Sequence, residues 1–442
     1  MSIGNLRDNG NKGNNFPYQL ASLKTLASIN ENIIDLTAAI VPESVGPMAN
    51  DAFGRLRVSQ PLTLFDSSHR YRDNGLWATS VKNGNATFSP NEGLVNLNIT
   101  TAGDARVLRE TYKVFSYQPG KSLLVFNTFV MAPAQTNLRQ RVGYFGENNG
   151  IYLQLDNSTL SFVERSIVTG VVTESVVNQS SWNVDKMDGT GPSGIVLDIT
   201  KAQILFMDIE WLGEGTVRVG FVIDGIFILC HRFNHANLIT STYITTASLP
   251  LRYEISNTGV TALSSTLKQV CSTVISEGGY ELRGAQQAVG TPIDTPRTFS
   301  TANTYIPVVG LKLTASKLDA IVILTAVSIL GLGNGKNYAW RIIQGGVITG
   351  GSWVSVGADS AVEYNLTGTS ASGGRILAQG YVNSSNQGSP SINILKEALF
   401  STQLERNGLT GVAFEVVVEV AISDASGTNG VYASADWEEI SR

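Results

Sequence analysis

Three apolar runs joined by very short connections, in residues 203–233 (QILFMDIEWLGEGTVRVGFVIDGIFILCHRF), constrain the fold more than any other part of the sequence. From Val217 to Phe221 every second residue is apolar, which is the pattern of a half-buried strand. Asp224-Gly225 separates this run from the last one, and such a pair is typical of a type I′ hairpin, which needs positive φ at both central residues. The segment therefore predicts a meander of three antiparallel strands.

Composition narrows the classes of protein to consider. The chain has 442 residues, enough for two or three domains, and its net charge is −5. Only 15% of the residues are charged, against roughly 25% in an average soluble domain. Phosphate contacts need a basic surface, so we expect no nucleic-acid partner. The sequence has no apolar run long enough for a membrane span, and its first residues lack the apolar core of a secretory signal.

Residues 19–41 carry the one convincing helical period of the sequence, within an N-terminal anchor that we place at residues 1–50. Apolar residues at 3-4-3-4 spacing fall on one stripe of a helix that Pro42 would end. Two heptads are too few for an independent coiled coil, so the helix either packs on its own domain or docks on a partner or a second copy. Residues 1–17, rich in Asn and Gly, are expected to be flexible unless a partner orders them. The predicted oligomerisation or docking stripe consists of Leu26, Ile29, Ile33, Leu36 and Ile40.

Short apolar runs between turn signals fill the rest of the chain. In residues 51–285 their spacing predicts a large β-sandwich, and residues 299–442 repeat the pattern with frequent glycines, which predicts a second one. The Pro-containing residues 286–298 are predicted as a linker. We therefore predict an all-β fold: two jelly-roll-like β-sandwich domains preceded by a short N-terminal helix. Beyond the meander, the expected strands are 94–99, 106–115, 123–130, 151–155, 160–163, 195–199, 251–255, 305–313, 321–330, 338–343, 354–362, 375–382, 392–399 and 414–422.

Asp208 and Glu210 are the residues of this sequence that most resemble a catalytic motif. Residues two apart on a strand face the same side, and two carboxylates on one face are what a glycosidase needs. The segment 206–210 resembles the Glu-x-Asp-x-Glu motif of the laminarinase and lichenase glycosidases, which use a concanavalin-like jelly roll. In that family the first Glu is the nucleophile, and Phe206 stands at that position here. We therefore expect solvent-facing carboxylates and no catalytic residue.

The histidines and cysteines do not predict a metal or cofactor site. His231 and His235, with Cys230 beside them, suggest a metal, but a zinc site needs three or four converging ligands. Their spacing of four suits a helix, whereas the first ends a strand and the second lies in an expected loop. His69 is far away in the sequence, and no nucleophile elbow or phosphate-binding loop is present. Cys230 and Cys271, the only two cysteines, are expected to be buried free thiols.

Five segments carry a family resemblance: DAFGRLRVS (51–59), LFD (64–66), RVGYFG (141–146), WLGEGTVRVGF (211–221) and LPLRYEI (249–255). They resemble stretches of virion structural proteins of tailed bacteriophages and other large DNA viruses. The VIDG hairpin also resembles the corresponding turn of laminin-G and concanavalin-like sandwiches. The resemblance covers about half of the chain and implies a virion component, with no catalytic residues to carry over.

We therefore predict a non-enzymatic bacteriophage structural protein, assembled in the host cytoplasm and located in the virion. Its N-terminal segment would dock on a tail, portal-proximal or capsid protein, and its β-domains would form a homo-oligomer, with a homotrimer favoured. The alternative is a receptor-binding module for a host-surface glycan, and a polysaccharide hydrolase is less favoured. The candidate glycan contacts are Trp211, Trp340 and Trp353. Trp77 and Trp182 are further possible stacking platforms among the six tryptophans of the sequence.

Overall fold

The computed structural model describes residues 59–279, 284–385 and 402–441. The helix predicted at 19–41, with Leu26, Ile29, Ile33, Leu36 and Ile40, lies outside these residues, as does the expected strand 392–399. The described part is nearly all β, which confirms the fold class, and its one helical element is the 3₁₀ turn η1 (Gln179–Ser181). None of its helical elements is long and apolar enough to cross a membrane.

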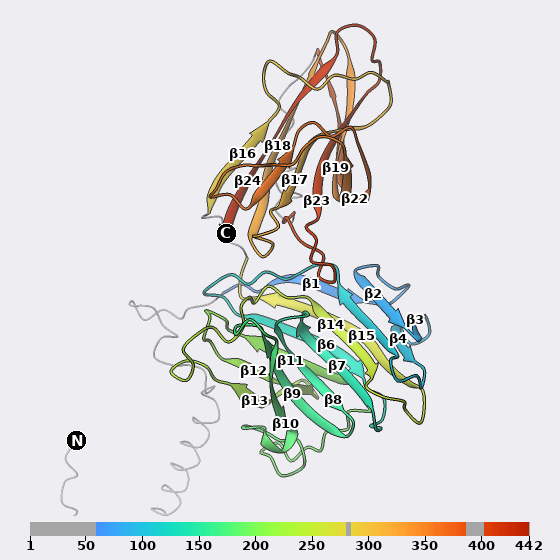
Figure 1. The fold of residues 1–442 in the computed structure, drawn as a ribbon, viewed down its shortest axis with the longest axis vertical. Coiled ribbons are helices and arrows are strands. Elements are labelled where there is room, and N and C mark those ends of the chain that lie inside the picture. The colour runs from blue at the N-terminus through green and yellow to red at the C-terminus, as the bar shows by residue number, and fades with distance from the viewer. Residues whose placement is uncertain (1–58, 280–283, 386–401, 442) are drawn as a thin grey trace, which may run out of the picture. The chain divides into compact units, whose positions relative to one another are not determined.

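The first β-sandwich is built from fifteen strands in two antiparallel sheets (Figure 1). Its strands are β1 (Leu62–Ser68), β2 (Trp77–Lys82), β3 (Gly84–Ser89), β4 (Leu94–Ile99), β5 (Arg106–Thr111), β6 (Leu123–Val130), β7 (Leu138–Phe145), β8 (Gly150–Asp156), β9 (Thr159–Ser166), β10 (Thr173–Asn178), β11 (Gln203–Ile209), β12 (Val217–Ile223), β13 (Ile226–Phe233), β14 (Leu251–Asn257) and β15 (Ser265–Ser276). The β6 sheet has the order β13-β12-β11-β6-β15-β4-β3, with β1 also paired to β15. The β7 sheet has the order β10-β9-β8-β7-β14-β5-β2.

The first hydrophobic core lies between these two sheets. Strand β6 turns Leu123, Val125 and Phe129 inward, while alternate residues of β8 in the other sheet contribute Ile151 and Leu153. Burying one such side chain stabilises the fold by roughly 1.5–3 kcal/mol, so the alternation seen in the sequence is what drives the two sheets together.

The predicted meander is confirmed as β11, β12 and β13, which pair in order. Asp224 and Gly225 both have positive φ, +53° and +79°, as a type I′ turn requires. Both cysteines are free thiols, as expected, but only Cys230 on β13 is buried; Cys271 on β15 is partly exposed, contrary to the expectation.

The second β-sandwich consists of a three-stranded and a six-stranded sheet, again antiparallel. Its strands are β16 (Ala285–Gly290), β17 (Ile306–Leu313), β18 (Ile321–Leu332), β19 (Asn337–Thr349), β20 (Val354–Ser355), β21 (Val362–Asn365), β22 (Ser370–Asn383), β23 (Glu415–Ile422) and β24 (Gly430–Ser441). The sheet orders are β16-β24-β18 and β20-β21-β17-β23-β19-β22. A separate core between them includes the fully buried Trp437 and Tyr338.

Several sequence expectations differ from the structure. The strand expected at 106–115 ends at Thr111, the last residue of β5, and only Phe115 beyond it forms an isolated bridge. The start of the predicted linker 286–298 belongs to β16, which pairs with β24 along its length. Residues 195–199 form only one isolated bridge, because the Asp198 side chain accepts from the Thr200 backbone N–H (3.0 Å) and turns the chain. The strand expected at 354–362 is split into β20 and β21 by a turn closed between Gly357 and Ser360.

Candidate functional site

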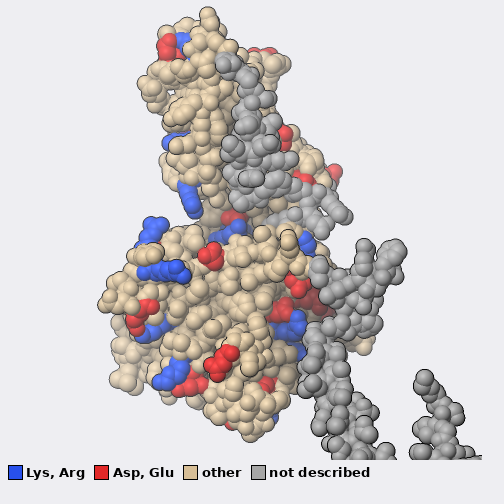
Figure 2. Space-filling model, turned by 180° about the vertical axis from the view of Figure 1, so that it is seen from behind, with Lys and Arg blue, Asp and Glu red and all other residues tan. Residues whose placement is uncertain are grey.

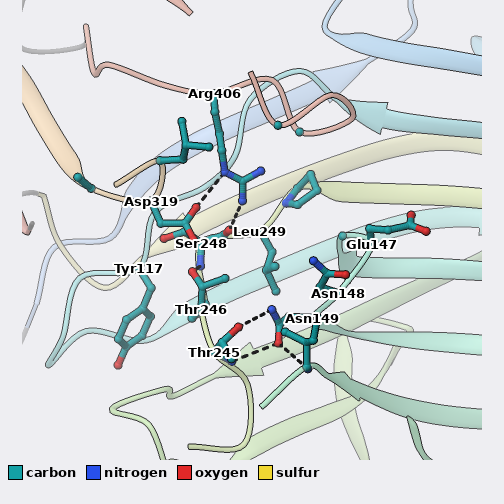
Figure 3. A pocket seen from close by; sticks show the side chains of 18 of the residues that line it. Tyr117, Glu147, Asn148, Asn149, Thr245, Thr246, Ser248, Leu249, Asp319 and Arg406 are labelled. Atoms are coloured by element: carbon teal, nitrogen blue, oxygen red, sulfur yellow. Dashed lines mark hydrogen bonds and ion pairs between the residues drawn. The ribbon is translucent and has the colours of Figure 1, made fainter. Parts of the chain in front are cut away.

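A cavity of about 850 Å³ lies where loops of the first sandwich meet loops of the second (Figure 3). Residues 146–149 and 245–250 line it from the first sandwich, and residues 315–320 and 406–411 from the second. Tyr117 and Trp211 line it as well, with their rings edge to face and 5.8 Å between centroids. The Trp211 indole N–H donates to the Ile244 carbonyl (3.2 Å), so this aromatic pair is held in one orientation.

The polar walls of this junction cavity are also fixed. The Asn149 amide donates to the Thr245 hydroxyl (2.8 Å), and its oxygen accepts from the Thr245 backbone N–H (3.1 Å). Arg406 donates to the Asp319 carboxylate (2.9 Å) and, across the junction, to the Ser248 carbonyl (3.4 Å). Figure 3 shows these side chains on opposite walls. The cavity thus combines one aromatic pair with several oriented polar groups, a lining that can contact a polar ligand.

Asp208 and Glu210 line a different cleft, of about 510 Å³, on the outer face of the β6 sheet. Phe206 lies two residues earlier on the same strand and packs edge to face on Phe227, with 5.1 Å between centroids. Burial raises the pKa of Asp208, which is ion-paired with Arg218 on the neighbouring strand. The position of the glycosidase nucleophile is therefore filled by a packed phenylalanine, and this pair offers no first step for retaining hydrolysis.

The two histidines near Cys230 have separate surroundings. His231 accepts from the Asn183 backbone N–H (3.3 Å) and burial lowers its pKa to about 4, so it stays neutral. His235 stacks on Tyr243 at 4.0 Å and faces Glu164 and the Gly215 carbonyl. Within the residues that the structure describes, no three His, Cys, Asp or Glu side chains converge as a metal site would require.

The candidate tryptophans do not come together. Trp77 and Trp182 are buried, the latter packed on Phe162 with 4.5 Å between ring centroids, so neither offers a stacking platform. Trp211 lines the junction cavity. Trp340 and Trp353 are half-buried in the second sandwich, where the ring of Trp353 is covered by the Lys312 ammonium at 4.1 Å.

The outer face of the β7 sheet carries a layer of buried charge that sequence reasoning missed. Arg252 is ion-paired with the fully buried Glu110, and Arg165 with Glu174 (2.6 Å). Arg141 lies on β7 between them and donates to Gln154 (2.8 Å). Charged residues spaced by two, as in RQR (139–141) and RYE (252–254), are the signal that would have shown a charged strand face.

Beneath these arginines the sheet face is aromatic. Phe145 and Tyr152 are fully buried and 4.4 Å apart, and the guanidinium groups of Arg252 and Arg141 lie 5.1 and 5.3 Å from their ring centroids. Gly143 lies directly beside Tyr152, where a Cβ would approach the Tyr152 backbone to 2.6 Å. Cation–π contacts of this kind hold the arginine side chains flat against the sheet, which leaves a cleft above them.

No protein-family model matches the chain, and no curated protein matches it. Several solved structures are similar at low identity. The carbohydrate recognition domain of Emp47p is 13% identical, over 52% of this chain and 99% of that one, with a TM-score of 0.31. A conserved carbohydrate esterase from the Shiga toxin-encoding bacteriophage phi24B is 12% identical, over 50% and 100% of the two chains (TM-score 0.30). The CBM2 module of the evolved Dit of Lactobacillus casei BL23 phage J-1 is 6% identical, over 51% and 100% (TM-score 0.31). All three TM-scores are below 0.5, so these likenesses carry no argument about function.

Proposed function

We propose that this chain is a non-enzymatic structural protein of a bacteriophage virion and that it assembles with copies of itself, most favourably as a trimer. The observation that carries the assembly is the edge of the six-stranded sheet formed by β22. This strand has 14 residues, pairs with β19 on one side, and has no partner strand on its other side among the described residues. A long edge strand presents unpaired backbone groups to any strand that approaches it.

The side chains of β22 leave its edge open to pairing with another copy of the chain. Ile376 is 46% exposed and Tyr381 is 87% exposed, while Arg375 is the strand's only charged residue. Monomeric proteins usually place charges, prolines or bulges on such an edge. Strand β22 has a bulge at Leu377, where its register against β19 shifts, but no proline. In the view of Figure 2 charged side chains are scattered over a surface that is otherwise neither acidic nor basic, as the 15% charged composition implies. Low charge suits surfaces that pack against copies of the same chain.

The rest of the proposal follows from the sequence resemblance. The resembling segments 141–146, 211–221 and 249–255 contribute to the first sandwich, and the N-terminal anchor is assigned to docking on a tail or capsid partner. Light scattering on the full chain at micromolar concentration tests the assembly. We expect three times the mass of one chain, and a monomer would contradict the proposal.

A second candidate function is recognition of a host-surface glycan, and the junction cavity is the observation that favours it. The Tyr117–Trp211 pair supplies an aromatic surface for a sugar ring, and the fixed Asn149 and Thr245 side chains supply polar contacts. A glycan array with the wild-type chain and Trp211→Ala tests it. We expect the wild-type chain to bind some of the glycans, and the variant to lose this binding while its circular dichroism spectrum is unchanged. Binding that the variant keeps would exclude this cavity as the glycan site.

A further inference from the structure

One cleft on the outer face of the β7 sheet, of about 440 Å³, brings together polar side chains from three neighbouring strands. Arg139 on β7 lies opposite Ser256 on β14, and Ser256 lies opposite Arg106 on β5. Glu254, two residues before Ser256 on β14, faces the same side and lines the same cleft. Antiparallel register therefore sets guanidinium groups, a hydroxyl and a carboxylate side by side on one strand face.

Most of the charge in this cleft is already neutralised within the protein. Arg106 donates to Glu254 Oε1 (3.1 Å), and Arg252 is paired with Glu110. Arg165 is paired with Glu174. Arg139, in contrast, forms no ion pair with any residue that the structure describes, and its Nε is buried without a hydrogen-bond acceptor.

Two further buried atoms in the cleft have no hydrogen-bond partner: Glu254 Oε2 and Ser256 Oγ. Their residues are 3% and 5% exposed. Arg252 Nη1 lies 3.9 Å from Glu254 Oε2, close enough for an ion pair but too far for a hydrogen bond. Buried polar groups are nearly always paired, and three unpaired atoms in one cleft therefore indicate a site for a polar ligand.

We propose that this cleft binds a carboxylated saccharide, with its carboxylate on Arg139 and its hydroxyls donating to Glu254 Oε2 and Ser256 Oγ. The two acceptors require a ligand with hydrogen-bond donors, which a sugar's hydroxyls supply. The unpaired guanidinium requires an anion, and its planar fork fits a carboxylate. Chloride and sulfate bring no hydrogen-bond donors for the two acceptors. This site goes beyond the assembly role, because pairing at β22 involves none of these residues.

The test is calorimetric titration of the full chain with three probes: sialyllactose, trigalacturonate and, as the neutral match of the first, lactose. We expect at least one acidic probe to bind at least tenfold more tightly than lactose. Arg139→Gln should weaken that binding at least tenfold and Arg139→Lys less, because an ammonium keeps the charge but not the fork. Arg232→Gln, an exposed arginine on β13, is the matched control and should change nothing.

Thermal unfolding of each variant checks that it is folded. Arg139 has no ion pair to lose among the described residues, so its substitution should leave the unfolding temperature within about a degree of wild type. The proposal is overturned by an absence of binding to both acidic probes, by equal binding of lactose, or by binding that Arg139→Gln does not weaken. Acidic-glycan binding lost in Trp211→Ala but kept in Arg139→Gln would assign the ligand to the junction cavity instead. None of these outcomes depends on the oligomeric state, so the assembly proposal is tested separately.

Discussion

The Gln403 side-chain amide donates a 2.7 Å hydrogen bond to the Ser116 hydroxyl, and both side chains are buried where the two sandwiches meet. Lys113 and Glu405 form an ion pair beside it (2.8 Å), and the Gly408 backbone N–H donates to the Tyr112 carbonyl (3.1 Å). The chain before β23 is thus fastened to the end of β5 by both side-chain and backbone contacts. These contacts hold the walls of the junction cavity in place.

Replacement of Gln403 by alanine should weaken this junction. The variant removes the hydrogen bond between two buried side chains, so we expect the free energy of unfolding to fall by about 0.5–1.5 kcal/mol. Urea denaturation followed by tryptophan fluorescence measures it. Asn91→Ala, an exposed amide in the turn between β3 and β4, serves as control and should change stability by less than about 0.5 kcal/mol. Equal losses of stability in the two variants would mean that the Gln403–Ser116 hydrogen bond does not stabilise the junction.

His235 should make the fold more stable in mild acid than in mild base. Burial opposes its charged form, but the Glu164 carboxylate (2.8 Å) and the Gly215 carbonyl (2.6 Å) outweigh burial and raise its pKa. A group whose folded pKa lies above the unfolded value of about 6.5 gives its full stabilisation below pH 6.5 and loses it as pH rises through the folded pKa. Unfolding temperatures across this range should fall with pH in wild type, and His235→Gln should flatten the slope. An unchanged slope in the variant would contradict the assignment.

His69 should make the fold less stable as the pH falls below 6.5, a pH dependence opposite in sign to that expected from His235. Burial and the nearby Arg109 lower its pKa to about 4, so its neutral form is favoured in the folded state. The corresponding stabilisation is present above pH 6.5 and is lost as pH falls from 6.5 towards 4. NMR titration of the ring protons checks this directly. We expect no protonation of His69 at pH 5.5, and a midpoint near 6.5 would show the ring to be accessible to water.

The buried Arg109 side chain links the two sheets of the first sandwich through polar contacts. It is 2% exposed, holds Asp73 through two bonds of 2.7 and 2.8 Å, and donates to Gln269 of the other sheet (2.8 Å). Breaking a buried pair costs about 3–5 kcal/mol, and because Asp73 stays partly exposed we expect Arg109→Met to cost about 3 kcal/mol. Denaturation of Arg109→Met beside Arg70→Met, an exposed arginine, measures it. A loss below about 1 kcal/mol would mean that the pair is not structural.

The edge of β22 should govern self-association. Ile376→Lys and Tyr381→Lys place a charge on that edge and, if copies meet there, should lower the mass seen by light scattering towards one chain. Val171→Lys, an equally exposed apolar residue in the loop between β9 and β10, is the control. If the Val171 variant also falls to a lower oligomer mass, or if both β22 variants keep the wild-type mass, the contact between copies does not lie at β22.

Period-two apolar patterns predicted strands well where the inward residues are large. The strands expected at 94–99 and 123–130 are β4 and β6 with the same bounds. Strands β1, β2, β3, β7, β10, β15, β16 and β24 were not predicted. The inward side of β15 includes the buried Gln269, which interrupts its apolar pattern. Strand β24 does alternate, with Val431, Ala433, Ala435 and Trp437 inward, but two of these four residues are alanines and make the pattern weak. Alternation is easiest to recognise when the buried side chains are apolar and large.

The candidate sites were harder to foresee. Tyr117 and Trp211 are 94 positions apart in the numbering, and only the packing of loops brings their rings together. The charged cleft was missed because arginine and glutamate normally indicate exposure, whereas Arg252 and Glu254 are 2% and 3% exposed through mutual pairing on one sheet face. Many strand residues could be predicted from apolar alternation, but the faces on which neighbouring strands meet could not.

Analysis of purified virions tests the central claim most directly. Particles released from cells that carry this gene would be banded on a density gradient, digested and examined by quantitative mass spectrometry, with an antibody against the second sandwich applied to intact particles in the electron microscope. The account predicts that the chain copurifies with the particles in a copy number divisible by three and that the antibody labels one fixed position on them. Its absence from gradient-purified particles, with the protein found free in the lysate, would contradict the account.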